Sequence, residues 1–366
     1  MNGRERIRTA LSLDQPDAVP TYVHAMNVPS ILQIGRLFTD GLPEGKALHE
    51  LSQVELLKVA DTLMLIHEEL DIDGITAVPL EHEHDLGGDR FRNEWGVVKE
   101  RSPHGLPVPV GHPIGSPQDL ASWQRPSPDP QRSALVARLM AMRFRDTKGL
   151  FFMVRGVFTN SWYLRGMHHL LVDFIRRPDF VDAITRQVTD YCLELIDLAA
   201  DVGAHVAIID DDMADKNNPM FSPRHYRSLI KPRHVELVDH AHARGLQIAL
   251  HSDGNLWPLL EDLVDAGFDG LNPLEPQAGM DLAGVKAAWG DRICLIGNID
   301  CGELLCHGTT AQVEEAVAQA IEDAAPGGGY ILCDSNSIHP GVDPDNFITM
   351  MRAARRFGAY AQEQRS

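Results

Sequence analysis

Short apolar runs that end in polar residues recur along this chain, and stretches with helical periodicity separate them. Runs of this length predict strands, and the polar residues after them predict loops at the carboxyl ends of those strands. The runs cover residues 19–23, 74–79, 150–157, 204–209, 246–250, 268–271, 293–296 and 329–333. Strands alternating with helices, without a Gly-x-Gly-x-x-Gly turn, favour an α/β fold of the closed (β/α)8 TIM-barrel type. No linker shifts the composition, so we expect one domain over residues 1–366.

Two segments stand outside this alternation. Residues 4–13 predict a short amphipathic helix before the first strand. Residues 90–99 alternate in polarity and residues 103–117 are rich in proline and glycine, which predicts a β-hairpin insertion and a loop after the second strand. Insertions after strands fall on the face where the carboxyl ends meet, so we expect this one to flank the mouth of the barrel.

Charge and cysteine content narrow the class of protein. A formal net charge of −19 argues against a nucleic-acid surface and against docking on anionic membranes. The chain shows no signal-like start and no apolar stretch of the roughly 18 residues that a membrane span needs. Five cysteines without a Cys-x-x-Cys pair indicate reduced thiols in the cytoplasm.

The strand over residues 246–250 ends in His251, which is followed by Asp253. Ligands of parallel α/β proteins bind at such strand ends, and imidazole serves there as acid, base or metal ligand. We therefore place His251 and Asp253 in the catalytic group, although both could instead cap the next helix. Asp210, Asp211 and Asp212 crowd three carboxylates at the end of another strand, where one could hold a proton or the group could bind a cation. We place Asp211 and Asp212 in the catalytic group, and an acidic N-cap is the alternative role for these residues.

Other polar residues follow the remaining strands, and we expect them to line the same mouth. Residues 81–85 look like a metal cluster, but alternation on a strand splits them over two faces and favours a solvated surface. Cys333 is better explained by packing than by ligation. The expected substrate-binding residues are His24, Thr159, Asn298, Asp300, Asn336 and His339.

These motifs together resemble the uroporphyrinogen decarboxylase family. The resemblance covers most of the chain and depends on the order and spacing of several short segments. They are residues 4–11 leading into 17–20, Glu94-Trp95-Gly96, residues 220–223, residues 251–255, residues 297–300 and residues 336–340. The resemblance implies a TIM barrel with its site at the carboxyl ends of the strands.

The family has two branches. One decarboxylates uroporphyrinogen without a metal and carries an arginine-rich segment after strand one, where this chain has residues 22–28 without arginine. The other moves methyl groups between a corrinoid protein and a thiol or another acceptor, using zinc. Its His-x-Cys motif matches His251, but Asp253 replaces the first cysteine and the second falls near Asn336.

We therefore expect a divergent member nearer the methyltransferase branch. It would act with a corrinoid or on a methoxylated or methylthio compound, using zinc or a harder divalent ion held by His251, Asp253 and Glu275. The expected partners are a small-molecule substrate and a corrinoid protein. Two alternatives stay open: a cofactor-free decarboxylase that uses Asp211 or Asp212, and a non-catalytic binding protein.

Overall fold

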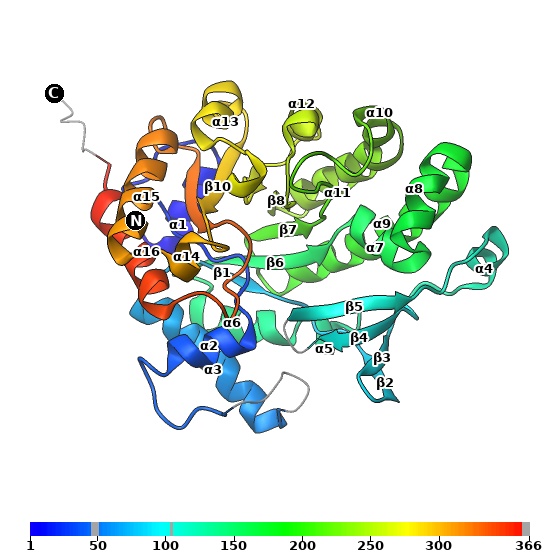
Figure 1. Ribbon diagram of the computed structural model, residues 1–366, viewed down its shortest axis with the longest axis horizontal. Coiled ribbons are helices and arrows are strands. Elements are labelled where there is room, and N and C mark those ends of the chain that lie inside the picture. The colour runs from blue at the N-terminus through cyan, green and yellow to red at the C-terminus, as the bar shows by residue number, and fades with distance from the viewer. Residues whose placement is uncertain (45–50, 103–104, 361–366) are drawn as a thin grey trace.

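The computed structural model describes residues 1–44, 51–102 and 105–360 of the chain. Its central element is a curled sheet of seven parallel strands in which neighbours in sequence are also neighbours in space, except for an insertion after the first (Figure 1). The strands are β1 (Gly74–Ala77), β6 (Gly149–Arg155), β7 (Val206–Asp210), β8 (Gln247–His251), β9 (Gly270–Asn272), β10 (Cys294–Ile299) and β11 (Tyr330–Asp334).

The predicted strand over residues 19–23 is not one of them, so the prediction of eight strands is wrong. This segment lies between β11 and β1 and makes only single parallel bridges, from Thr21 to Leu332 and from Tyr22 to Gly74. Pro20 contributes a carbonyl to the amide of Leu332 but has no N–H of its own to extend the ladder. The segment nevertheless brings His24 to the same edge as the ends of the strands.

Helices connect the strands and cover the outside of the sheet (Figure 1). Proline at position 178 is the first residue of a helix, where its missing N–H is tolerated. The longer helices are α1 (Gly3–Leu11), α2 (Val28–Gly35), α3 (Gln53–Glu69), α6 (Leu135–Phe144), α7 (Val157–Arg165), α8 (Met167–Arg176), α9 (Pro178–Asp201), α11 (Lys231–Ala243), α13 (Leu282–Trp289), α15 (Thr310–Ala324) and α16 (Pro344–Phe357). The shorter ones are α4 (Pro117–Ser122), α5 (Pro130–Ser133), α10 (Pro223–His225), α12 (Leu260–Asp265) and α14 (Leu304–His307).

The insertion between β1 and β6 is larger than a hairpin. It is a four-stranded antiparallel sheet of β2 (Glu83–Gly87), β3 (Arg90–Asn93), β4 (Val98–Ser102) and β5 (Gly105–Gly111). Pro107 and Pro109, which suggested a loop, belong to the edge strand β5, where a missing N–H is tolerated. Residues 103 and 104 of the predicted loop lie outside the described residues. The sheet approaches α7 through Lys99, whose ammonium lies 5.0 Å from the centre of the Tyr163 ring.

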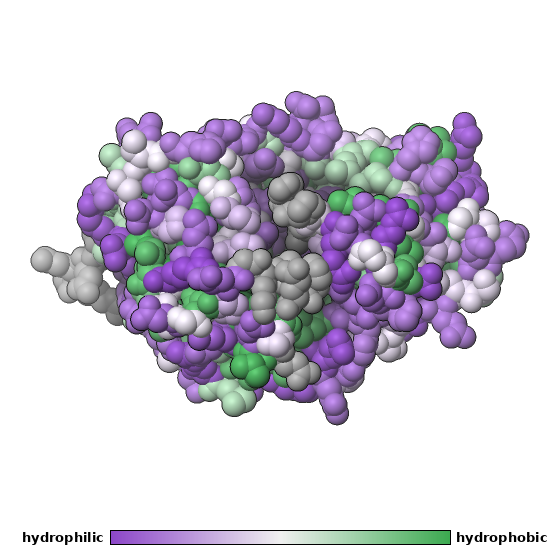
Figure 2. Space-filling view, turned by 60° about the horizontal axis from the view of Figure 1, so that its bottom comes forward, coloured by the Kyte–Doolittle hydropathy of each residue, from purple (hydrophilic) through white to green (hydrophobic). Residues whose placement is uncertain are grey.

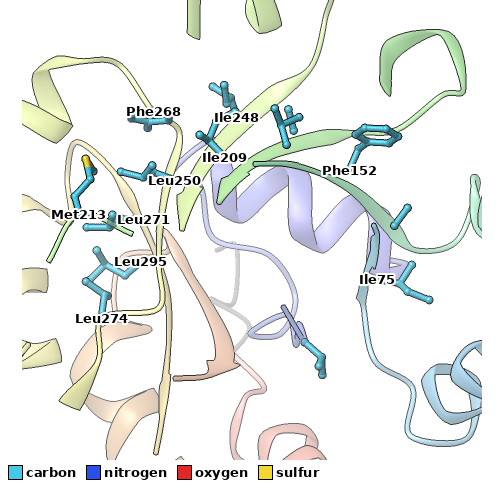
Figure 3. Packing of buried hydrophobic residues seen from close by; sticks show 14 of the residues in the cluster. Ile75, Phe152, Ile209, Met213, Ile248, Leu250, Phe268, Leu271, Leu274 and Leu295 are labelled. Atoms are coloured by element: carbon cyan, nitrogen blue, oxygen red, sulfur yellow. The ribbon is translucent and has the colours of Figure 1, made fainter. Parts of the chain in front are cut away.

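The core has two parts. Between the sheet and its outer helices lies a large cluster that includes Phe152, Ile209 and Leu250 (Figure 3). A smaller cluster on the other face of the sheet contains alternate strand residues, such as Val206 and Ile208, together with α1. The amide of Arg4 bonds the carbonyl of Thr147, just before β6, so α1 covers the amino ends of the strands. The carboxyl ends are left for polar side chains.

The face of the molecule in Figure 2 is largely hydrophilic, and its hydrophobic side chains lie in small groups. No helix in the described part of the chain combines the length and the apolar character that crossing a membrane requires.

Candidate functional site

His251 is the last residue of β8, and its ring is held in one orientation. The register pairs it with Asp210 of β7 on one side and with Asn272 of β9 on the other. Its Nδ1 lies 2.5 Å from the side-chain oxygen of Asn272, whose amide nitrogen donates to the carbonyl of Ile296 at 3.1 Å. Because the Asn272 oxygen can only accept, His251 donates from Nδ1. Its Nε2 is therefore the atom available for chemistry.

Three carboxylates surround this Nε2, and together with His251 they form what we call the His251 cluster. The distances from Nε2 are 3.5 Å to Asp253, 3.9 Å to Asp210 and 3.9 Å to Asp212. Burial alone would lower the pKa of His251, but the three carboxylates outweigh it and the net pKa is raised. The cluster is thus a buried imidazole facing a concentrated negative charge.

Asp253 is the carboxylate with an unmet hydrogen-bonding capacity. Its Oδ2 accepts from the side-chain amide of Asn336, whereas its Oδ1, which faces His251, is buried and has no hydrogen-bond partner among the described residues. Burial raises the pKa of Asp253 to about 7, helped by the charges of Asp212, Glu275 and Asp210 and opposed by His251. A cation beside Oδ1 would satisfy that oxygen and relieve the repulsion.

His24, which follows the segment between β11 and β1, extends the cluster. Its ring stacks on that of His251 with 3.9 Å between centroids and 5° between planes. Burial and the neighbouring imidazole hold the pKa of His24 well below the usual range, which keeps this ring neutral. A neutral ring face can lie against a charged or metal-bound imidazole without repelling it.

The donor atoms fit a divalent cation. Ligand atoms of Asp212, His251 and Asp253 lie within 4.8 Å of one another, as do those of His24, Asp210 and His251. Imidazole and carboxylate suit zinc and harder divalent ions, and Nδ1–H donation to a fixed oxygen is typical of a ligating histidine. The expected ligand Glu275 belongs to neither group. Its Oε2 accepts a hydrogen bond from the amide of Gly254 at 2.9 Å.

Asp211 and Thr159 were expected in the site, but the structure gives them other partners. Asp211 is fully buried and accepts from the amides of Thr159 at 2.7 Å and Phe158 at 3.1 Å, in the first turn of α7. It also contacts Nε2 of His234 at 3.0 Å. The Thr159 hydroxyl accepts from the amide of Asp212 at 3.1 Å. Both residues therefore support the position of Asp212 instead of facing the His251 cluster.

The remaining expected residues lie near other loops. Asn298 donates to the carbonyl of Leu274 at 3.0 Å. Asp300 accepts from Gln277 and from the amides that begin α14, and His339 Nε2 lies 3.1 Å from the carbonyl of Cys301. Of this group only Asn336 touches the cluster, and substrate binding by the others stays a prediction.

The sequence analysis missed Arg155, and from the three crowded carboxylates it chose Asp211 and Asp212 for the catalytic group but not Asp210. Arg155 ends the apolar run of β6, so the strand-end pattern could have found it. Its guanidinium lies 3.4 Å from Asp210 and 3.5 Å from the hydroxyl of Tyr163. Arg155 and His251 hold the pKa of Asp210 below its usual value despite burial.

The cysteines behave as predicted where the structure tests them. Cys192 and Cys294 are buried on α9 and β10, and all five thiols are free. Cys333 is fully buried, and burial raises its pKa well above the usual range. It belongs to neither of the ligand groups found among the described residues.

Comparison with known proteins gives consistent matches. Residues 97–357 match the family described as uroporphyrinogen decarboxylase (URO-D). A uroporphyrinogen decarboxylase of Pseudoalteromonas translucida is 24% identical over 191 residues, which is 50% of this chain and 50% of that protein. The chain therefore spans about half the length of this relative.

The methyltransferase matches cover more of the chain. The methylcobamide:CoM methyltransferase MtaA of Methanosarcina barkeri is 26% identical over 295 residues, 79% of this chain and 82% of that protein. A solved structure of a methyltransferase from Methanosarcina mazei aligns with a TM-score of 0.76 and 19% identity, covering 98% of this chain and 99% of that one. At this identity the structural match supports the fold.

Proposed function

Because this chain belongs to the uroporphyrinogen decarboxylase family, as a divergent member near the methyltransferase branch, we propose that it is a metal-dependent methyltransferase. It would move a methyl group between a corrinoid, carried by a partner protein, and a small acceptor such as a thiol or a methoxylated or methylthio compound. The His251 cluster carries this proposal, because three carboxylates converge on an imidazole nitrogen whose tautomer is fixed.

We assign His251, Asp253 and Asp212 as the residues that would hold the divalent ion. A bound zinc-like ion supplies Lewis acidity, which lowers the pKa of an acceptor thiol or water. Asn272 keeps the His251 nitrogen aimed at the site, and Asn336 holds one Asp253 oxygen so that the other faces inward. Asp210 links His251 to Arg155, and Glu275 fixes the loop at Gly254.

The chemistry of the donors also explains the departures from the thiolate motif. Asp253 and Asn336 stand where the methyltransferase branch has cysteines, and in this structure they contact each other. A carboxylate replaces a thiolate without loss of charge, whereas the amide of Asn336 is neutral and donates a hydrogen bond to Asp253. The expected site is therefore one of nitrogen and oxygen donors, which suits a harder ion than a thiolate-rich site does.

The test is metal content, measured on purified protein by mass spectrometry after exhaustive dialysis. Wild-type protein should retain about one divalent ion per chain, and His251→Ala and Asp253→Ala should lose it. His84→Ala is the matched control, because His84 lies on the exposed strand β2 among other acidic and imidazole groups. Equal metal in wild type and His251→Ala would refute the ligand assignment.

A second measurement addresses the reaction. Wild-type protein should accelerate demethylation of methylcobalamin by a thiol, followed by absorbance, and His251→Ala should not. Release of carbon dioxide from candidate acids by metal-free protein, without corrinoid dependence, would instead favour the decarboxylase alternative.

A further inference from the structure

A row of three buried polar side chains adjoins the His251 cluster and takes no part in the function proposed above. Asp211, His234 and Tyr226 each have 0% relative exposure. Nε2 of His234 lies 3.0 Å from Oδ2 of Asp211, and its Nδ1 lies 3.0 Å from the hydroxyl of Tyr226. His234 belongs to α11, and Tyr226 begins η2 (Tyr226–Ile230), a π-helical turn between α10 and α11. The row therefore connects the outer helices to the residue that follows β7.

The hydrogen bonds in this row have fixed directions. The carboxylate of Asp211 accepts, so His234 donates to it from Nε2. Burial raises the pKa of Tyr226 well above its usual range, and the charge of Asp211 adds to the shift, so the hydroxyl keeps its proton. That hydroxyl donates to Nδ1 of His234, the ring nitrogen left as an acceptor. Every polar atom of the three side chains then has a partner, and a buried polar network in this state makes its surroundings rigid.

The segment held by this row carries the proposed ligand Asp212. Three consecutive backbone amides after β7 each donate to α7 or to the segment that ends β8. They are the amides of Asp211, Asp212 and Met213, which donate to the carbonyl of His251 at 2.9 Å, the hydroxyl of Thr159 at 3.1 Å and the hydroxyl of Ser252 at 3.0 Å. The Asp211 side chain bonds the first turn of α7, where Thr159 lies, and His234 joins the same side chain to α11.

Asp212 is the ligand that most needs support from its backbone. Its side chain is 44% exposed, against 25% for Asp253 and 5% for His251. An exposed side chain has more conformational freedom to lose when it binds a metal ion. Oδ1 of Asp212 also accepts from the amide of Asp253 at 3.0 Å, so a shift of the Asp212 backbone would disturb two ligands at once.

Packing alone does not explain a buried histidine and tyrosine at this place. A buried polar group costs free energy unless it is fully hydrogen-bonded, whereas apolar side chains of similar volume carry no such condition. The ring of Phe268, 5.4 Å from that of His234, shows that apolar neighbours are available. A π-helical turn such as the one at Tyr226 is also rare and often accompanies a functional site.

We propose that His234 and Tyr226 are positioning residues for Asp212, acting through Asp211 and Thr159. This inference rests on the proposed function, because it assigns residues that support the same metal site. A carboxylate that is held in place before the ion arrives pays less conformational entropy on binding, so the row raises the affinity for the metal.

The first test measures the zinc affinity of the full chain by competition with a chelating dye, at a temperature where circular dichroism shows each variant folded. His234→Leu removes the donor to Asp211, and Thr159→Val removes the acceptor for the Asp212 amide. Each should weaken zinc binding about 10–100-fold. Thr159→Ser keeps the hydroxyl and His234→Gln keeps an N–H donor, so each should bind zinc more tightly than its partner variant. Tyr226→Phe removes only the outermost hydrogen bond and should cause a smaller loss; no loss would exclude Tyr226 from the role.

The matched control is His67→Leu, because His67 is also a buried histidine but lies on α3. Whatever its effect on the free energy of unfolding, His67→Leu should leave the zinc affinity unchanged. A purely structural role for His234 predicts the same result for His234→Leu. If His234→Leu fails to fold, His234→Gln and Thr159→Val decide the question.

The second test needs no metal and uses hydrogen exchange, followed by mass spectrometry, on metal-free protein. The amides of residues 211–213 should exchange faster in His234→Leu and Thr159→Val than in wild type, and His67→Leu should not change them. Unchanged exchange in Thr159→Val and His234→Leu, or unchanged zinc affinity in both, overturns the inference. Faster exchange in these variants, combined with no zinc bound by wild type, upholds the support of Asp212 and refutes the metal role alone.

Discussion

Replacing Asp211 with alanine should lower the stability of the folded protein, although its neighbours in sequence, Asp210 and Asp212, both belong to the His251 cluster. Its carboxylate accepts from the amides of Phe158 and Thr159 and contacts the imidazole of His234, and it is fully buried. The N-cap of α7 is Gly156, which has no side chain to bind these amides, so Asp211 caps the helix from the neighbouring strand. A Cβ at position 156 would lie 2.2 Å from that of Asp211, which explains the glycine.

The magnitude follows from the donors that Asp211→Ala leaves unpaired. Each buried donor without an acceptor costs about 1–3 kcal/mol, and Asp211→Ala leaves two backbone amides and the His234 ring nitrogen without their partner. Because the three interactions share one carboxylate, their costs do not add fully. We expect a loss of about 3–5 kcal/mol in the free energy of unfolding, a large part of the roughly 5–15 kcal/mol typical of a domain.

The assay is urea-induced unfolding followed by circular dichroism, with Asp210→Ala as the matched variant. The side-chain contacts of Asp210 are ion pairs of 3.4 and 3.9 Å, and its removal also relieves repulsion with Asp212 and Asp253, so its loss should cost less stability than the loss of Asp211. Asp210→Ala should instead impair activity. Equal stability losses in the two variants, or a loss below about 1 kcal/mol in Asp211→Ala, would refute the assignment of Asp211 to structure.

Three further predictions concern other parts of the molecule. Asn272→Ala removes the acceptor that fixes the His251 tautomer, so metal affinity should fall about 10–100-fold in competition with a chelating dye; unchanged affinity would contradict this role. His67 is buried, and its Nε2 has no hydrogen-bond partner in the described part of the chain. Burial lowers the pKa of His67 to about 4, so the folded state binds fewer protons than the unfolded state. Stability should therefore be complete above about pH 6.5 and fall by roughly 3 kcal/mol as the pH drops to 4. In His67→Leu the urea midpoint of unfolding should change less with pH across that range than in wild type, whereas the exposed control His84→Leu should follow wild type. Parallel curves of midpoint against pH for His67→Leu and wild type would exclude the effect. Cys333 is fully buried, so iodoacetamide should modify it slowly both with and without a chelator; rapid labelling after chelation would identify it as a ligand.

The sequence by itself determined where the polar residues of the site begin. Apolar runs long enough for strands, each followed by polar residues, are local features, and they located His251, Asp253 and Asn336 correctly at strand ends. Proline at position 178 likewise marked the boundary between two helices. Such signals depend only on residues that are close together in the chain, so they can be recognised from the sequence alone.

The tertiary structure decided which residue of each strand end faces the site. Val206 and Ile208 point toward the smaller core cluster, and strand alternation then turns Asp210 inward and Asp211 outward. Both faces of a parallel strand are buried, so β7 is apolar up to Asp210 and shows no alternation from which this could be read. The stacking of His24 on His251 and the approach of Lys99 to the ring of Tyr163 join segments far apart in the chain. Those contacts follow from the curl of the sheet and the packing of the insertion, which no local pattern encodes.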